Sequence, residues 1–269
     1  MTLNLLAGVC RAISDAISTV PPSEAGRILR KGAGGDSTKT IDLVAEEAAV
    51  KYLEATGFQG TLVSEELGTR QFGHERFPVM ILDPVDGTTN AVRGLNFYSI
   101  SVAVSGGMRL SDCYAAMVME LPTGRKFAAE LGKGATMNGA RITMPDPPLL
   151  KGSLIGVDLN VLGDTEKLER IVPLILGAKH IRNMGSAALE LCLVASGGLD
   201  LYADNRGLLR VTDVAAAVLV IREAGGLVLD MNGAPLDCPI DISHRISLIA
   251  GSKTICDEAL ALMNTKIRV

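Results

Sequence analysis

The apolar residues of the first half of the chain are spaced first like a helix and then like a sheet. Between residues 3 and 18 they recur every third or fourth position, which predicts an amphipathic helix that ends before Pro21. A second helix is predicted for residues 40–56. Short apolar runs then predict strands over residues 60–64, 79–82, 98–105, 113–121, 127–130 and 140–143. Because the later runs follow one another without a helix, we expect an antiparallel sheet.

The pattern changes after a group of prolines that ends at Pro148. Strands now alternate with helices, which is typical of a layered arrangement. We predict helices over residues 165–176, 185–196, 214–224 and 254–263. Strands are predicted over residues 153–157, 180–182, 199–202, 226–230 and 247–250. The chain is therefore expected to have two parts, residues 1–148 and residues 149–269, and a layered α+β or α/β fold.

Composition narrows the function classes. Hydrophobic residues make up 48% of the chain and charged residues 21%, so a well-packed globule is expected. The net charge of −4 and the scarcity of aromatic residues argue against nucleic-acid partners. Five scattered cysteines without a CxxC pair indicate buried thiols in a reducing compartment. We see no signal peptide and no apolar run near the ~20 residues of a membrane span, so a cytoplasmic protein without membrane partners is expected.

Residues 78–90, PVMILDPVDGTTN, contain the most informative stretch. An apolar strand ends abruptly in two carboxylates, Asp83 and Asp86. Buried carboxylates are costly unless a cation or hydrogen-bond donors compensate them. Gly87 allows a sharp turn and close approach of a ligand to the backbone. The stretch predicts a turn that holds a hard cation and presents N–H groups to an anion, with an ordinary Asx turn as the alternative.

Further acids lie at the ends of other predicted elements. Glu65 and Glu66 follow the strand at 60–64, which favours a site because sites in open α/β folds form at the carboxyl ends of strands. Asp42 lies in the first turn of the second helix, where an acid usually complements the helix dipole. The segment 31–40, KGAGGDSTKT, is expected to be a mobile loop and lacks P-loop spacing. No GxGxxG follows a strand, so a dinucleotide-binding Rossmann domain is set aside.

Four segments together resemble the inositol monophosphatase family: DPVDGTTN at 83–90, SEE at 64–66, GSAALEL at 185–191 and TDVAAA at 212–217. They are most similar to its archaeal-type dual inositol monophosphatase/fructose-1,6-bisphosphatase branch. The resemblance covers nearly the whole chain and implies an αβαβα sandwich. It also implies a Mg²⁺-dependent phosphatase and a homodimer. One departure is Thr212, which stands where many members have Trp.

The resemblance also implies a metal centre. Its ligands are the carboxylates of Glu65, Asp83, Asp86 and Asp213 and the backbone carbonyl of Val85. Two or three Mg²⁺ are implied for each site, with Mn²⁺ as a substitute, and Asp36 is expected to help bind a further, weaker metal. Mg²⁺ prefers oxygen ligands, and two metals ~3.5–4 Å apart stabilise the attacking and leaving oxygens of an in-line displacement.

Asp42 and Thr88 resemble the catalytic pair that orients the attacking water. The implied substrate-binding residues are Asp86, Gly87, Thr88, Arg182, Gly185, Ser186, Ala187 and Arg206. The two arginines match positions that contact substrate in the dual-activity branch, which suits a second phosphate or several hydroxyls because a guanidinium binds pairs of oxygens. Arg210 and His180 are weaker candidates.

The favoured function is hydrolysis of phosphomonoesters of inositol and sugars, such as inositol 1-phosphate and fructose 1,6-bisphosphate, whose order of preference the sequence leaves open. A nucleotide phosphatase that acts on NADP or 3′-phosphoadenosine 5′-phosphate is the alternative. The few aromatic residues for stacking an adenine make it less favoured. A non-catalytic protein that binds metal or polyol phosphates is the third hypothesis.

Overall fold

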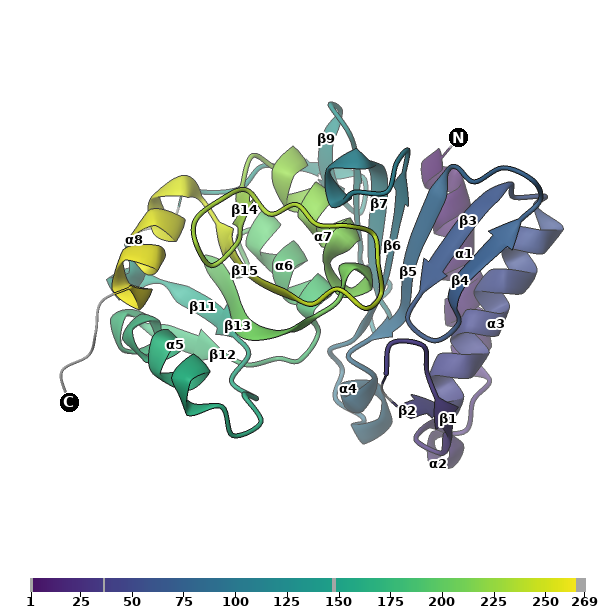
Figure 1. Ribbon diagram of the computed structural model, residues 1–269, viewed down its shortest axis with the longest axis horizontal. Helices are drawn as coiled ribbons and strands as arrows, with labels where there is room; N and C mark the ends of the chain where they lie inside the picture. Colours follow the sequence, from purple (N-terminus) through teal and green to yellow (C-terminus); the bar gives the residue numbers. More distant parts are fainter. Residues whose placement is uncertain (1, 36, 147–148, 265–269) are drawn as a thin grey trace.

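The computed structural model describes residues 2–35, 37–146 and 149–264. Asp36, expected to help bind a metal, and Pro148, at the predicted boundary, lie outside these ranges. The described residues form five layers in the order helix, sheet, helix, sheet, helix (Figure 1). The predicted αβαβα sandwich is therefore confirmed. The helix pairs of the three helical layers are α1 (Thr2–Ser18) with α3 (Thr40–Ala55), α6 (Ala187–Ala195) with α7 (Val211–Glu223), and α5 (Thr165–Gly177) with α8 (Lys253–Met263).

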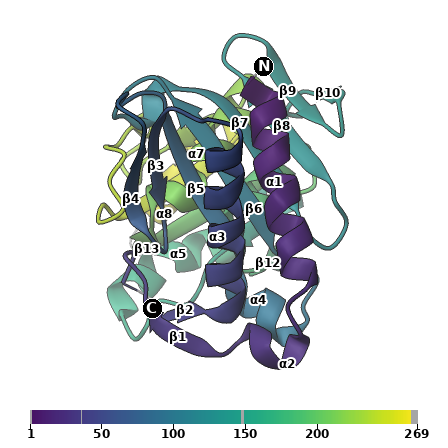
Figure 2. The same cartoon turned by 90° about the vertical axis from the view of Figure 1, so that its right-hand side faces the viewer.

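The first sheet has eight strands in the order β10-β9-β8-β7-β6-β5-β3-β4. Their bounds are β3 Gly60–Ser64, β4 Gly68–Phe72, β5 Val79–Asp86, β6 Ser99–Ser105, β7 Cys113–Glu120, β8 Lys126–Glu130, β9 Gly134–Met137 and β10 Ala140–Ile142. The strands from β5 to β10 pair antiparallel, as predicted, whereas β3 pairs parallel with β5. Figure 2 shows α1 and α3 side by side on the outer face of this sheet.

Strand β4 was not predicted, because its sequence GTRQF exposes three central residues and lacks an apolar run. It forms a hairpin with β3 at the edge of the sheet. The two strands that end in acids, β3 and β5, are therefore not successive along the chain. They are nevertheless neighbours in the sheet, and their parallel register places Ser64 opposite Leu82.

The second sheet has five strands in the order β12-β11-β13-β15-β14. Their bounds are β11 Leu154–Val157, β12 His180–Arg182, β13 Leu201–Leu209, β14 Leu227–Leu229 and β15 Ile246–Gly251. Strands β12, β11 and β13 run parallel, and β13, β15 and β14 pair antiparallel. The prediction for β13 stopped at residue 202, because the polar residues that follow interrupt the apolar pattern.

Helix α7 lies between the two sheets and is buried from Val211 to Ile221. One hydrophobic cluster joins α6 and α7 to strands of both sheets. A helix that is apolar on all sides is expected in such a position. The two parts predicted from the sequence therefore share a core, although each contributes its own sheet.

The predicted loop over 31–40 is wrong in part, since β1 (Ile28–Lys31) and β2 (Ser37–Lys39) pair antiparallel there. This hairpin lies near the two short helices α2 (Pro22–Ala25) and α4 (Thr88–Arg93), at the lower end of the view in Figure 2. Within the described ranges, no helix combines the length and apolar character that crossing a membrane demands.

Candidate active site

A cavity of about 330 Å³ opens where β3 and β5 end and where α3 and α7 begin. Its walls contain every described residue that was predicted as a metal ligand or as part of the catalytic pair. The lining residues are Ser37, Lys39, Asp42, Glu65, Glu66, Asp83, Val85, Asp86, Gly87, Thr88, Thr89, Gly185, Arg210 and Asp213. Four predicted substrate-binding residues do not line it: Arg182, Ser186, Ala187 and Arg206.

Three of the predicted ligands form a tight group. Carboxylate oxygens of Glu65, Asp83 and Asp213 lie within 4.8 Å of one another. The parallel register of β3 and β5 explains the first two. Ser64 and Leu82 lie opposite each other, so Glu65 and Asp83, the next residues along each chain segment, lie side by side. Asp213 comes from the first turn of α7, which begins at Val211, three residues before the predicted start at 214.

The electrostatics of this group call for a cation. Burial, and then the charge of Asp213, raises the pKa of Glu65 well above its usual value. Burial, and then Glu65, does the same to the pKa of Asp83. Burial and Asp213 raise the pKa of Asp86 to about 7. Oxygen donors that are buried together and repel one another fit a hard divalent cation, which would stabilise their ionised forms.

Asp86 lies beside the group and connects the two halves of the molecule. Its Oδ2 accepts hydrogen bonds from Ser186 Oγ at 2.5 Å and from the Ala188 N–H at 2.8 Å, both at the start of α6. Ser186 is fully buried. Its hydroxyl bonds to Asp86, and the role predicted for its backbone N–H in contacting substrate stays a prediction.

The predicted catalytic pair is in contact. Asp42 accepts a hydrogen bond from the Lys39 N–H at 2.9 Å through Oδ2, and its Oδ1 lies 2.9 Å from Thr88 Oγ1. The same hydroxyl lies 2.9 Å from the Val85 carbonyl oxygen. Because a hydroxyl carries one hydrogen and two lone pairs, Thr88 can donate to Asp42 and still accept from a water. Burial raises the pKa of Asp42 to about 6.

Asp213 is held in the same way as Asp42, which shows a common local design. Each acid is the third residue of its helix and accepts a hydrogen bond from the backbone N–H of the residue before the helix. For Asp213 this donor is the Arg210 N–H at 2.9 Å, and Thr212 Oγ1 lies 3.1 Å from its other oxygen. These hydrogen bonds orient both carboxylates, which line the cavity.

Gly87 is required by its surroundings. Its φ is +89°, a region that favours glycine, and a Cβ there would lie 3.0 Å from the Gly185 carbonyl oxygen. The turn is therefore pressed against the turn that precedes α6. It also begins α4, whose first N–H groups have no acceptor within the helix.

Two basic residues line the cavity: Lys39, which was not predicted from the sequence, and Arg210, which was only a weaker candidate. Lys39 directly precedes α3, and Arg210 directly precedes α7. The Arg210 guanidinium lies 3.1 Å from Glu65 Oε1 and donates to the Gly34 carbonyl at 3.2 Å. The signal for both was their position, since each precedes a helix whose first turn carries a functional acid.

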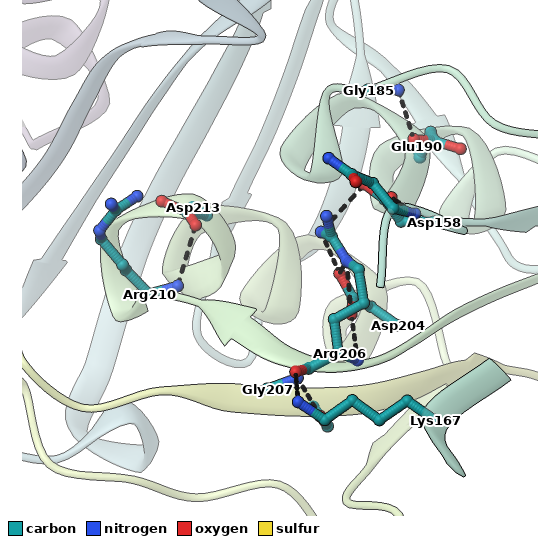
Figure 3. A network of polar contacts seen from close by, with 11 residues as sticks. Asp158, Lys167, Gly185, Glu190, Asp204, Arg206, Gly207, Arg210 and Asp213 are labelled. Atoms are coloured by element: carbon teal, nitrogen blue, oxygen red, sulfur yellow. Dashed lines mark hydrogen bonds and ion pairs between the residues drawn. The ribbon is translucent and has the colours of Figure 1, made fainter. Parts of the chain in front are cut away.

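Glu190 was also missed. It is 1% exposed, lies in the otherwise apolar helix α6, and accepts a hydrogen bond from the Gly185 N–H at 3.2 Å (Figure 3). Burial raises the pKa of Glu190 to about 8. An acid in the sequence AALELCLVA was the available signal.

The two predicted substrate arginines lie outside the cavity. Arg182 is exposed at the end of β12 and donates to the Ile181 carbonyl. Arg206 is bound by Asp158 and Asp204, as Figure 3 shows. Neither arginine is among the residues that line the cavity with the three grouped acids.

Comparison with known proteins agrees with this geometry. The family model described as the inositol monophosphatase family matches residues 5–266. A fructose-1,6-bisphosphatase/inositol-1-monophosphatase of Methanothermobacter thermautotrophicus is 36% identical over 249 residues, covering 89% of this chain and 86% of the relative. A bifunctional NADP phosphatase/NAD kinase of Methanococcus maripaludis is 31% identical over 290 residues; the match covers 100% of this chain but only 50% of that protein.

A solved structure shares the fold. The crystal structure of an inositol monophosphatase–fructose 1,6-bisphosphatase superposes with a TM-score of 0.82 at 29% identity, covering 96% of this chain and 98% of that one. The layered fold, the acidic cavity and the match along nearly the whole sequence therefore agree. The chain belongs to the inositol monophosphatase family, a family of metal-dependent phosphomonoester hydrolases.

Proposed function

We propose that this chain is a Mg²⁺-dependent phosphatase that hydrolyses phosphomonoesters of inositol and sugars, among them inositol 1-phosphate and fructose 1,6-bisphosphate. The observation that carries the proposal is the convergence of Glu65, Asp83 and Asp213 within 4.8 Å in the cavity that also holds Asp42 and Thr88. These residues come from four separate segments of the chain. Their convergence supports a single centre for a cation and a water.

The metal is held by the three grouped acids, by the Asp86 oxygen that Ser186 does not bind, and by the Val85 carbonyl. We propose two or three Mg²⁺ for each site, with Mn²⁺ as a substitute. When bound, the metal supplies positive charge that stabilises the phosphoryl transition state and lowers the pKa of water. The all-oxygen donor set and the raised pKa of Asp86 support this assignment.

Asp42 and Thr88 orient the attacking water. The Thr88 hydroxyl accepts a hydrogen bond from the water while it donates its own hydrogen to Asp42 Oδ1, 2.9 Å away. When the water attacks, it passes a proton to the Thr88 hydroxyl, and Thr88 passes its own proton to Asp42. Its raised pKa of about 6 supports this role, because a base works best when its pKa lies near the operating pH.

The phosphate lies against the turn at Gly87. The backbone N–H groups of Gly87 and Thr88 donate to its oxygens, and the two cations of the cavity wall, Lys39 and Arg210, add positive charge. The rest of the substrate extends past Gly185. A loose phosphoryl transition state needs positioning and charge stabilisation more than a strong protein nucleophile, and this site offers both.

A nucleotide substrate is the second candidate. It is favoured by the match of the whole chain to half of a protein named for NADP phosphatase activity. The cavity itself is lined by polar and charged residues, and no Phe, Tyr or Trp is among its described lining residues. This lack of a stacking surface for adenine keeps the nucleotide second.

A homodimer in the cytoplasm is also proposed. The family resemblance supports the dimer. The cytoplasmic location is supported by the five cysteines, all buried and unpaired, which suit a reducing compartment. Light scattering of the purified protein tests the dimer directly.

A phosphate-release panel tests the proposed function. Inositol 1-phosphate, fructose 1,6-bisphosphate and NADP are supplied separately, each with Mg²⁺ and with a chelator. We expect release from the first two only when Mg²⁺ is present. Metal-independent release, or turnover of NADP alone, would contradict the proposal.

A further inference from the structure

The peptide unit between Met184 and Gly185 is held at both of its ends. The Met184 carbonyl oxygen accepts a hydrogen bond from Asn90 Nδ2 at 2.6 Å. The Gly185 N–H donates to Glu190 Oε2 at 3.2 Å (Figure 3). Because a peptide unit is planar and rigid, its C=O and its N–H turn together. The unit therefore cannot rotate without losing both hydrogen bonds.

The conformation of Gly185 explains why such a clamp is needed. Its φ is +80°, and the heavy atom nearest to a Cβ built there would be Asn90 Nδ2 at 3.5 Å, an ordinary van der Waals contact. Glycine adopts positive and negative φ about equally readily, so the backbone of the turn does little to fix its own orientation. The side chains of Asn90 and Glu190 supply that restraint, and we call this pair the peptide clamp.

The peptide clamp joins two parts of the molecule. Asn90 belongs to the short helix α4, which follows the acids of β5, and its Nδ2 also donates to the Phe97 carbonyl oxygen at 2.8 Å. Glu190 belongs to α6, which follows the turn itself. Asn90 is 9% exposed and Glu190 is 1% exposed. Two buried side chains from separate helices thus meet on one peptide unit.

The Glu190 carboxyl provides one acceptor oxygen to the turn. Its other oxygen, Oε1, has no hydrogen-bond partner among the described residues. A Cβ on Gly156 of β11 would lie 2.9 Å from Oε1, so the glycine leaves the room that this carboxyl occupies. Burial raises the pKa of Glu190 to about 8, and a carboxyl with that pKa is largely protonated at pH 7. The turn therefore requires an acceptor oxygen here and does not require a charge.

The peptide clamp determines where the cavity wall lies at Gly185. This residue lines the cavity, and its carbonyl oxygen would lie 3.0 Å from a Cβ on Gly87. Rotation of the preceding peptide unit would move this wall relative to the turn at Gly87, where the phosphate is proposed to lie. The hydrogen bonds described for the Asn90 and Glu190 side chains all go to backbone groups outside the predicted metal ligands. The clamp is therefore expected to affect the fit of the substrate and to leave the metal centre unchanged.

Building on the proposed function, we infer that Asn90 and Glu190 are positioning residues, which promote substrate binding by fixing the orientation of the peptide unit between Met184 and Gly185. Neither Asn90 nor Glu190 is among the residues that line the cavity. Both act through Gly185, past which the substrate extends.

The first test needs no substrate. Hydrogen exchange of the Gly185 amide, followed by NMR, reports directly on its bond to Glu190. Glu190→Ala removes the acceptor, so exchange should become about tenfold faster. Glu190→Gln keeps an acceptor oxygen on a side chain of similar shape and should exchange at the wild-type rate. Val194→Ala, at another buried position of α6, is the matched control and should leave the exchange of Gly185 unchanged.

The second test uses steady-state kinetics with inositol 1-phosphate. Glu190→Ala should raise KM about tenfold, the effect of one lost hydrogen bond. Its kcat and the Mg²⁺ concentration for half-maximal activity should stay near the wild-type values. Glu190→Gln should restore the wild-type KM, and Val194→Ala should lower stability without changing KM. A merely structural role for Glu190 would not separate KM from kcat in this way.

Several outcomes would overturn the inference. A Glu190→Ala variant that folds by circular dichroism and keeps the wild-type exchange rate or the wild-type KM contradicts it, as does a Glu190→Gln variant as impaired as Glu190→Ala. If Glu190→Ala does not fold, Asn90→Asp decides, because it replaces the donor to Met184 by an acceptor: faster exchange with a raised KM supports the inference, and wild-type values contradict it. If the wild-type protein releases no phosphate, the proposed function fails, while the exchange rates still decide whether the clamp exists.

Discussion

Two regions of the molecule bring carboxylates together but balance their charge differently. One is the group of Glu65, Asp83 and Asp213, and the other is the cluster around Arg206. In both regions carboxylates directly follow paired residues of parallel strands: Glu65 and Asp83 follow Ser64 and Leu82, and Asp158 and Asp204 follow Val157 and Ala203. At Arg206 the chain supplies its own cation, which binds two aspartates within 3.1 Å. Among the three grouped acids, the Arg210 guanidinium forms an ion pair with Glu65, and the Arg210 N–H donates to Asp213. The buried Asp204 therefore has its own cation within the chain, whereas the group of Glu65, Asp83 and Asp213 calls for an ion from solution.

The largest effect is expected from Asp83→Asn. This change removes a ligand from the centre of the acid group while an amide oxygen can still accept from the Val85 N–H. We expect Mg²⁺-dependent phosphate release to fall by at least about 10³-fold, because the metal contributes several kcal/mol to transition-state stabilisation. Steady-state kinetics over a range of Mg²⁺ concentrations measure it. Near-wild-type turnover would remove Asp83 from the metal centre.

The next effect is on stability, where the same substitution should act in opposite directions in the two regions. Asp204→Asn breaks a buried ion pair and should cost about 3 kcal/mol of unfolding free energy. Asp83→Asn removes a charge that its neighbours repel, so the metal-free protein should be unchanged or more stable. Urea unfolding with a chelator present compares the two variants. Equal destabilisation by both would break the contrast drawn above.

A smaller effect concerns pH. Burial raises the pKa of Asp42 from 3.8 to about 6 and that of Asp86 from 3.8 to about 7. A carboxyl whose pKa is higher in the folded state makes folding less favourable as pH rises from the unfolded toward the folded value. The metal-free protein should therefore lose stability between about pH 4 and pH 7, and Mg²⁺ should restore it near pH 7. Thermal unfolding across this range, with and without Mg²⁺, measures both effects; a metal-free protein that gains stability as pH rises would contradict them.

The sequence predicted which acids line the cavity better than it predicted the positions of Arg182 and Arg206. The apolar run before Asp83 and the short spacing to Asp86 were local signals, and the resemblance added the distant acids. The pairing of β3 with β5 could not be seen, because the polar edge strand β4 lies between them in the chain. The sequence also contained no sign that two aspartates bind the Arg206 side chain. Its partner Asp158 directly follows another strand, β11, and only the register of β11 with β13 brings the two residues together.

The contacts of the turn at 185–187 could not be predicted from the sequence of the turn itself. Motif resemblance assigned Gly185, Ser186 and Ala187 to the substrate. In the folded chain, the Gly185 N–H donates to Glu190 and the Ser186 hydroxyl to Asp86, while the role predicted for the N–H groups of Ser186 and Ala187 stays a prediction. These bonds need two carboxylates to be buried next to α6. Burial of that kind depends on the second sheet, which no pattern within the motif specifies.

Calorimetric titration with Mg²⁺ alone tests the central claim, that the acids of the cavity converge to bind a cation which the chain does not supply. The wild-type protein should bind Mg²⁺ and release protons near pH 7, because carboxyls with raised pKa values must ionise to become ligands. Asp204→Asn should retain this binding and Asp83→Asn should lose it. Absence of binding by the folded wild-type protein, or equal binding and proton release by Asp83→Asn, would contradict the account.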